Sequence, residues 1–549
     1  MLKVLENPLY YLDNFHHVIE WISKRYQDIL NKDETNFLQQ FLALPQASRA
    51  LFVRMVMRKG QFFRESKLTY SEIGPSSDAV SFLCDLGWVT LNPHIDIDRL
   101  FTLLTKSEIN TTFQLSSVEK KLLKSDQLEM LRISYTEAKP FSEWGSVCTD
   151  AVYQILNKPL CDRLRLIFFG NLRQDWSEFI LSDLGIYVYE KIDLPSSSRG
   201  FQSRQDIDDY LALHLCKERF YNRVPIDDVL QELDLCLPTN LWLIRRKDKL
   251  LFEIGQHLEK QKNWEHAFRI YITTAYPGAR LRTIRVLEKN NQAQLAAQWL
   301  EKAMQAPESE AEYQQLCRIA PRLNRKLQLP PLAPVNKTPI PEIHLRLPAP
   351  NSSFFVEGTV RDYLHQDDAP VFYVENGLIN SLFGLLCWPA IFAAIPGAFF
   401  HPFHQGPVDL LSTDFHVRRH TEFDACFCEL DSDQYRQTMC QRFKEKRGIQ
   451  CPFVFWHMLN DELLCLALDC IPAIHLKKLF QRILFDIKTN RSGLPDLIQF
   501  WPKERRYNMI EVKGPGDRLQ DNQKRWIEYC LRHMIPISVC YLAWDEELV

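Results

Sequence analysis

The stretch GLPDLIQFWPKERRYNMIEVKGPGDRLQDNQKRWI, residues 493–527, decides the fold of the C-terminal part of this chain. Aliphatic, aromatic and β-branched residues concentrate at 497–501, at 507–512 and again at 537–544, which predicts three strands. The run 518–534 has helical periodicity and lies between the last two strands. This order predicts an α/β core with one crossover helix.

Two acids and a lysine in this stretch have a spacing that suits metal-dependent chemistry. Pro-Asp at 495–496 precedes Glu-Val-Lys at 511–513 in the pattern D-x14-E-x-K. Side chains alternate along a strand, so Glu511 and Lys513 point to one face, and a neighbouring strand can bring Asp496 beside them. Two carboxylates and the Val512 carbonyl offer hard oxygen ligands for Mg²⁺ or Mn²⁺. Such a cation assists phosphodiester hydrolysis, and Lys513 would orient or help deprotonate the attacking water.

An E-x-K triplet alone is weak support, because about two copies are expected in a chain this long. The chain has four copies. Only the one at 511–513 follows a Pro-Asp pair at this spacing, and we interpret the other three as solvated charges. A surface ion pair at a strand end is the alternative for 511–513, although Asp496 and Glu511 would then repel one another.

The region before this core has helical periodicity and ends at a proline-rich boundary. Residues 330–350 contain seven prolines in 21 residues, which excludes a regular helix and predicts a linker. Apolar residues recur at helical spacing in successive runs over 248–327. The pattern Trp264-x2-Ala267-x3-Tyr271 is similar to a tetratricopeptide helix, but no second copy follows at the 34-residue period, so degenerate helical hairpins are an equal alternative.

Near the N-terminus, the segment LTYSEIGPSSDAVSFLCDLGWVTL (68–91) contains a helix start, a Gly-Pro break and a helix that closes at Gly87 before a β-prone run. This order suits a winged-helix unit. A basic stripe lies just upstream, interleaved with phenylalanines and opposed only by Glu65. It would neutralise phosphates, and a solvated helix face is the equal alternative. The basic stripe consists of Arg54, Arg58, Lys59, Arg64 and Lys67.

Composition sets broader limits. With 549 residues, 46% of them apolar and 25% charged, the chain has the composition of a soluble globular protein of several domains, which excludes a disordered or fibrous one. A net charge of −3 excludes a uniformly basic nucleic-acid binder but leaves room for local basic patches. The apolar run 376–400 contains two prolines, which favours a buried helix and a turn over a membrane span.

The cysteines and the N-terminus predict the compartment. Fifteen cysteines occur without a CxxC pair, and the first residues lack the pattern of a secretory signal. We therefore expect reduced thiols and a cytoplasmic location, associated with the nucleoid in a bacterium, or a nuclear location in a eukaryote.

Three blocks of sequence resemble known nucleases. GLPDLIQFW with MIEVKGPGDRLQDNQKRWI resembles the VRR-NUC domain, a branch of the PD-(D/E)xK nucleases, and Gln523-x2-Trp526 is part of that likeness. LFVRMVMRKGQFFRESKLTYSEI at 51–73 resembles the N-terminal region of the Fanconi-anaemia-associated nuclease family. Glu375 through SLFGLLCWPAIF resembles that family's helix entering the nuclease domain. The blocks span most of the chain, so the resemblance implies the complete architecture of a bacterial-type member.

The resemblance implies a multidomain fold, mainly α in its N-terminal and middle regions, with a C-terminal α/β core like that of restriction endonucleases. The expected regions are an N-terminal helical and winged-helix-like DNA-binding region at 1–110, SAP-like and connecting helices at 111–240, TPR-like helical repeats at 241–329, a Pro-rich linker at 330–352 and the VRR-NUC domain at 353–549.

The resemblance also implies a metal-dependent, structure-specific nuclease that cuts 5' flaps, has 5'-directed exonuclease action and serves interstrand-crosslink repair. By this likeness Glu375, Asp496, Glu511 and the Val512 carbonyl would hold Mg²⁺ or Mn²⁺, Lys513 would act on the nucleophile and Gln523 would support it. A lone carboxylate on an apolar stretch, as Glu375 is, needs a partner, and a metal is one.

The expected partner is branched or 5'-flap double-stranded DNA, bound by a monomer or weak dimer, with a possible protein partner on the TPR-like helices. Eukaryotic members have a lysine for a 5'-terminal phosphate where this chain has Asn522, so we expect Lys488, Arg491 and Arg518 to contact the backbone instead. Two alternatives stay open: a dimeric nuclease of the Holliday-junction resolvase type, and a non-catalytic helical-repeat scaffold that binds DNA or protein.

Overall fold

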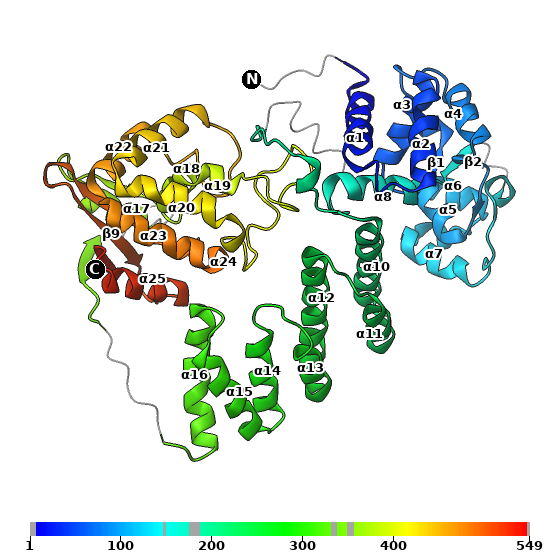
Figure 1. The fold of residues 1–549 in the computed structure, drawn as a ribbon. Coiled ribbons are helices and arrows are strands. Elements are labelled where there is room, and N and C mark those ends of the chain that lie inside the picture. Colours follow the sequence, from blue (N-terminus) through cyan, green and yellow to red (C-terminus); the bar gives the residue numbers. More distant parts are fainter. Residues whose placement is uncertain (1–6, 146–149, 175–186, 331–337, 349–355, 546–549) are drawn as a thin grey trace. The chain divides into compact units, whose positions relative to one another are not determined.

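In the computed structural model the chain folds into two compact units (Figure 1). The first unit comprises Met1–Tyr187 with Gly200–Ile207, and the second comprises Val188–Arg199 with Asp208–Val549. The structure describes residues 7–145, 150–174, 187–330, 338–348 and 356–545.

The first unit combines helices with small antiparallel sheets. Its described helices include α1 (Tyr10–Tyr26), α2 (Lys32–Ala43), α3 (Gln46–Met57), α4 (Ser76–Asp85), α5 (Ile97–Leu103), α6 (Lys106–Thr112), α7 (Lys124–Arg132) and α8 (Lys158–Phe169). Strands β1 (Phe62–Arg64), β5 (Val152–Ile155) and β2 (Val89–Leu91) form one sheet in that order, and β3 (His94–Ile95) pairs with β4 (Lys139–Pro140).

The helix predicted to close at Gly87 is α4, which begins after the Gly-Pro break. Gly87 has a φ of +69°, which only glycine adopts without strain, and this lets the chain turn from α4 directly into β2. The predicted helix that closes at Gly87 and the strand after it are confirmed, whereas residues 71–73, where the sequence indicated a helix start before the Gly-Pro break, form a turn.

Much of the second unit consists of α-helices joined by short turns, and the first of these helices starts within the segment Gly200–Ile207 of the first unit. They are α10 (Arg204–Tyr221), α11 (Ile226–Leu235), α12 (Leu241–Lys260), α13 (Trp264–Tyr271), α14 (Ala279–Lys289), α15 (Ala293–Gln305) and α16 (Glu310–Lys326). We call α12–α16 the helical repeats. A Cβ atom on Gly255 of α12 would lie 2.6 Å from the Tyr271 ring of α13, so glycine permits this close approach. The successive helices predicted over 248–327 are confirmed.

A five-stranded mixed sheet forms the C-terminal core of the second unit. Its order is β6 (Glu342–Pro348), β10 (Ile537–Asp545), β9 (Arg506–Lys513), β8 (Leu497–Trp501) and β7 (Val371–Tyr373). β10 is parallel to β6 and β9, and α25 (Asp521–Arg532) makes the crossover from β9 to β10. The three predicted strands and the crossover helix are confirmed.

The predicted linker at 330–352 is wrong over Glu342–Pro348, because these residues form the edge strand β6. Residues 331–337 and 349–352 of that linker lie outside the described residues. An edge strand pairs on one side only, so it tolerates Pro341 directly before it and Pro348 as its last residue, the prolines that argued against regular structure.

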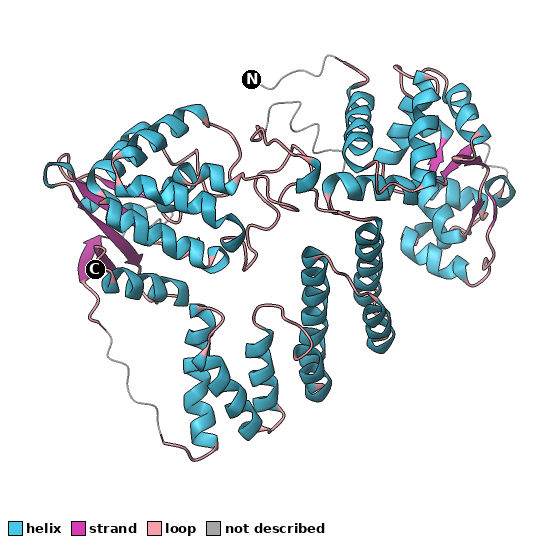
Figure 2. Cartoon of the chain, viewed as in Figure 1, coloured by secondary structure: helices cyan, strands magenta, loops and turns pink. Residues whose placement is uncertain are grey.

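Helices pack on both faces of the sheet, on one beside Ile510 and Val512 and on the other beside Met509 and Val539. They dominate the rest of this unit (Figure 2). They include α17 (Val356–Leu364), α18 (Leu378–Leu386), α19 (Trp388–Ile391), α20 (His420–Cys428), α21 (Gln434–Glu445), α22 (Asp461–Cys470), α23 (Ala473–Phe485) and α24 (Ile487–Asn490). Every residue of α18 is buried, as predicted for the apolar run at 376–400. Among the described helices, none has the length and apolar character needed to span a membrane.

Candidate active site

The ends of β8 and β9 bring the predicted acids together. The antiparallel register pairs Leu497 with Ile510, and one step further it places Asp496 opposite Glu511. Asp496 Oδ2 accepts a hydrogen bond of 2.8 Å from the Val512 amide, and Lys513 Nζ lies 2.6 Å from Glu511 Oε1. All three charged side chains are buried, with Glu511 only 1% exposed. Strand alternation therefore places the three groups in one cluster, as expected.

The cluster has less positive charge than its acids require. Burial raises the pKa of Glu511 to about 8, and the nearby negative charge of Asp496 adds to this effect. Burial also raises the pKa of Asp496 to about 6, although the Val512 amide and Lys513 act in the opposite direction. One ammonium for two buried carboxyls leaves an environment in which a further cation would be favourable.

Glu375 lies at the same edge of the sheet. It follows β7, whose Tyr373 pairs with Leu497 of β8, and its charge contributes to the raised pKa of both Asp496 and Glu511. The Tyr373 hydroxyl donates to Glu375 Oε2, and Asn376 Nδ2 donates to Oε1 at 3.2 Å. Unlike the other two acids, Glu375 is exposed.

The available ligands fit an open magnesium or manganese site better than a closed cage. The N–H and C=O of one strand residue point to the same side, so the Val512 carbonyl also faces the side of Asp496. In the described part of the chain, no group of three or more His, Cys, Asp or Glu side chains is arranged to hold a metal ion. Mg²⁺ commonly uses one or two carboxylates and completes its shell with water and substrate phosphates, so the residues present fit it.

Sequence reasoning missed a fourth acid, Glu357. It lies in the first turn of α17, and its charge contributes to the raised pKa of Asp496 and of Tyr373. Its neighbour Val356 lies 3.4 Å from the Cβ position of Gly514, the residue after Lys513. The surrounding sequence has no motif, because tertiary packing of α17 alone brings this acid to the site.

Gln523 has a different contact from the one expected. Its Oε1 accepts a 2.7 Å hydrogen bond from the Gln520 amide and closes a capping box at the start of α25. None of the hydrogen bonds described for this part of the chain joins it to Lys513. To support the lysine, its side chain would have to leave the cap.

The cations expected near the site differ in their contacts. Arg491 is half-buried and donates to the Pro452 carbonyl at 3.2 Å. Lys488 and Arg518 are exposed. These two therefore present more accessible positive charge to a polyanion than Arg491 does.

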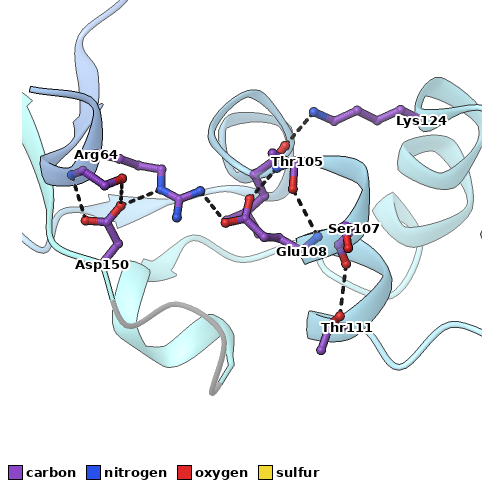
Figure 3. Close-up of polar contacts among 9 residues, drawn as sticks. Arg64, Thr105, Ser107, Glu108, Thr111, Lys124 and Asp150 are labelled. Carbon is purple, nitrogen blue, oxygen red and sulfur yellow. Dashed lines mark hydrogen bonds and ion pairs between the residues drawn. The ribbon is translucent and has the colours of Figure 1, made fainter.

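The expectation that only Glu65 opposes the basic stripe is wrong. Arg64 lies between Asp150 and Glu108, with its guanidinium 2.8 Å and 2.7 Å from their carboxylates (Figure 3). Arg54 pairs with Glu72 at 2.7 Å. These three acids come from later segments, so local sequence does not reveal them. The remaining members of the stripe, Arg58, Lys59 and Lys67, are exposed.

Known protein families match three parts of the chain. The HTH domain of FAN1 matches residues 9–90, the Fanconi anemia-associated nuclease SAP domain matches 94–144, and the VRR-NUC domain matches 430–544. The SAP match thus begins ahead of the boundary expected at 111.

Relatives and a solved structure match nearly the whole chain. A Fanconi-associated nuclease 1 homolog of Pseudomonas aeruginosa is 50% identical over 543 residues, which cover 99% of this chain and 97% of that one. The homolog of Arabidopsis thaliana is 23% identical, over 96% of this chain and 66% of its own length. A crystal structure of paFAN1 bound to 2-nt 5' flap DNA with a gap superposes with a TM-score of 0.92 at 49% identity, and covers 99% of this chain and 100% of that one. The chain belongs to the Fanconi-associated nuclease 1 family.

Proposed function

We propose that this chain is a Mg²⁺- or Mn²⁺-dependent DNA nuclease that hydrolyses phosphodiesters near 5' flaps and serves interstrand-crosslink repair. The observation that best supports this proposal is the buried cluster of Asp496, Glu511 and Lys513, which lies where β8 begins and β9 ends. Its full-length likeness to a protein whose structure contains 5' flap DNA supports the choice of substrate over a four-way junction.

The roles follow from the geometry of the cluster. Asp496, Glu511, Glu375 and the Val512 carbonyl would hold the cation. When bound, a divalent cation offsets negative charge on the phosphate and lowers the pKa of a coordinated water. Lys513 is held beside Glu511, so its ammonium stands to orient the attacking water and to stabilise charge that develops on the phosphate. Gln523 would support Lys513 after leaving its cap.

The exposed cations would hold the DNA backbone. Arg58, Lys59 and Lys67 of the basic stripe, with Lys488 and Arg518, are exposed and suited to phosphates. Because Arg54 and Arg64 are already paired with acids, we expect their contribution to DNA affinity to be smaller.

The test is cleavage of a labelled 5'-flap duplex. Glu511→Ala and Lys513→Ala should each lower the rate by at least about 100-fold, because each removes part of the charge arrangement that acts in the transition state. DNA binding should remain near that of the wild type, and EDTA should stop cleavage. Glu504→Ala, an exposed acid at the β8–β9 turn, is the control. Undiminished cutting by either active-site variant would refute the site assignment.

A further inference from the structure

Helix α16 has a second, polar face directed at the nuclease core. Its apolar side packs within the helical repeats through Leu316, Ile319 and Leu323. On the opposite side Glu310, Gln314 and Arg318 recur every four residues and therefore lie on one face. We call these three residues the α16 polar face.

Each residue of the α16 polar face bonds to α23 or α25. Both terminal nitrogens of Arg318 donate to the carboxylate of Asp521, one of them at 2.6 Å. The two terminal nitrogens of Arg482 lie 3.0 Å and 2.7 Å from the two carboxylate oxygens of Glu310. The Arg482 side chain is buried and its guanidinium lies over the Trp526 ring. Two-point pairing of this kind fixes orientation as well as distance.

A third contact completes the interface. Arg525 Nη1 donates to Gln314 Oε1 at 2.5 Å. The contacts thus extend over Asp521 and Arg525, one helical turn apart at the start of α25. This interface consists of charged and amide groups, and small polar interfaces of this kind permit relative motion once their specific contacts are lost.

The start of α25 also contacts the loop that precedes Asp496 and strand β8. A Cβ atom on Gly493 would lie 2.7 Å from the Asn522 side chain, so the two residues touch. The indole of Trp526 donates to the Ser492 carbonyl at 3.2 Å. These contacts hold the start of α25 against the segment that leads to Asp496, so α16 is connected to the active site through α25.

The chain itself provides a longer connection between the helical repeats and the core. It leaves α16 at Lys326 and enters the sheet at Glu342 in β6. The side-chain contacts of α16 therefore connect the helical repeats to the core more directly than the chain between Lys326 and Glu342 does. Their geometry sets the orientation of α16 on α25.

We propose that the α16 polar face is a positioning element that selects which phosphodiester reaches the active site. This inference rests on the proposed function. When residues ahead of α16 bind the duplex, the distance along the DNA from their contacts to Asp496 and Glu511 is fixed only while α16 stays bound to α25. Because small misplacements of reacting groups are costly, loss of this tie changes both the place and the rate of cutting.

The experiment reverses one charge in the full chain. Arg318→Glu places a negative charge against the carboxylate of Asp521. Arg322→Glu, one turn further along α16, is the matched control, because it breaks an ion pair with Glu288 inside the helical repeats. Each variant is given an end-labelled 5'-flap duplex, and the cut positions are resolved to single nucleotides. Hydrolysis of the p-nitrophenyl ester of thymidine 5'-phosphate with Mn²⁺ reports the chemistry without DNA placement.

Arg318→Glu should spread incision over several neighbouring phosphodiesters and lower kcat/KM on the flap about tenfold. Ester hydrolysis should not change, and Arg322→Glu should cut as the wild type does. Adding Asp521→Arg to Arg318→Glu should narrow the cut pattern again. A cut pattern for Arg318→Glu equal to that of Arg322→Glu, or no narrowing in the paired swap, would overturn the inference. Failure of the wild type to cut the flap would instead count against the proposed function.

Discussion

At the scale of single residues, Glu511 carries the largest electrostatic cost in the site. Its pKa is raised to about 8 in the folded chain, against about 4.3 for an unperturbed glutamate. Between these values the folded state keeps a proton that the unfolded state has lost, so stability falls as pH rises through this window and levels off above it. Asp496, with a pKa raised to about 6, acts in the same direction at lower pH.

We therefore expect Glu511→Gln to stabilise the metal-free protein at pH 8 and to have little effect at pH 5. The amide cannot ionise, so the repulsion with Asp496 disappears, and Lys513 can pair with the remaining acid. A gain of about 1 kcal/mol would raise the melting temperature of a domain of this size by about 2–4 °C. Thermal melts in EDTA at both pH values measure it. Parallel pH profiles for the two proteins would show that Glu511 does not titrate as inferred.

The limits of prediction at this scale follow from the range of each interaction. Asp496, Glu511 and Lys513 were predictable because strand alternation is a local rule. Glu357 was not, since only the packing of α17 brings it to the site. Likewise Arg64 looked available to DNA until the structure placed Glu108 and Asp150 on either side of it.

At the scale of elements, Gly493 lies in the loop that leads to Asp496 and β8, and it packs against helix α25. Its φ is +84°, and an added Cβ would lie 2.7 to 2.9 Å from Asn522. Gly448 is a matched control, because its φ is +82° and an added Cβ would meet nothing within 4 Å. A substitution at either site bears the same backbone strain, and only Gly493 adds a steric clash.

Gly493→Ala should therefore destabilise the protein by about 1–3 kcal/mol more than Gly448→Ala does. It should also slow flap cleavage, because the displaced Asn522 shifts the start of α25. Urea denaturation gives the difference in stability. Cleavage is measured without denaturant, at a temperature at which both variants are folded. Equal behaviour of the two variants would mean that Asn522 moves aside without cost.

The elements themselves were largely predictable, with one instructive exception. The strands that became β8, β9 and β10 are rich in aliphatic, aromatic and β-branched residues, a pattern that can be read from the local sequence. β6 was not predicted, because prolines lie directly before it and at its end. Its alternation of Ile343, Leu345 and Leu347 with polar residues was the signal that a half-buried edge strand leaves in the sequence.

At the scale of the whole molecule, the basic stripe that we propose to contact DNA and the candidate active site lie in different units, although Lys488 and Arg518 add proposed DNA contacts within the second unit. The basic stripe and the HTH and SAP matches belong to the first unit, whereas every candidate active-site residue belongs to the second. The net charge of −3 concealed this arrangement, because acids elsewhere balance the local basic groups. The sequence located the basic stripe and the active-site residues. It could not show that residues 188–199 belong to the second unit, because that depends on contacts between distant segments, such as those of Glu190 with Lys446 and Trp388.

A fragment comprising residues 188–549 should therefore retain chemistry and lose selectivity. It keeps the bonds of Glu190 to Lys446 at 2.8 Å and to the Trp388 indole at 3.0 Å, which tie the start of the second unit to its core. We expect Mn²⁺-dependent hydrolysis of the p-nitrophenyl ester of thymidine 5'-phosphate at the full-length rate. The preference for a 5' flap over a linear duplex should fall, because the fragment lacks the phosphate contacts that we propose for the basic stripe. The same fragment with Glu511→Ala is the control for contaminating nuclease, and circular dichroism checks that it is folded. If the folded fragment kept the flap preference of the full chain, substrate recognition would lie in the second unit, and the basic stripe would lose its assigned role.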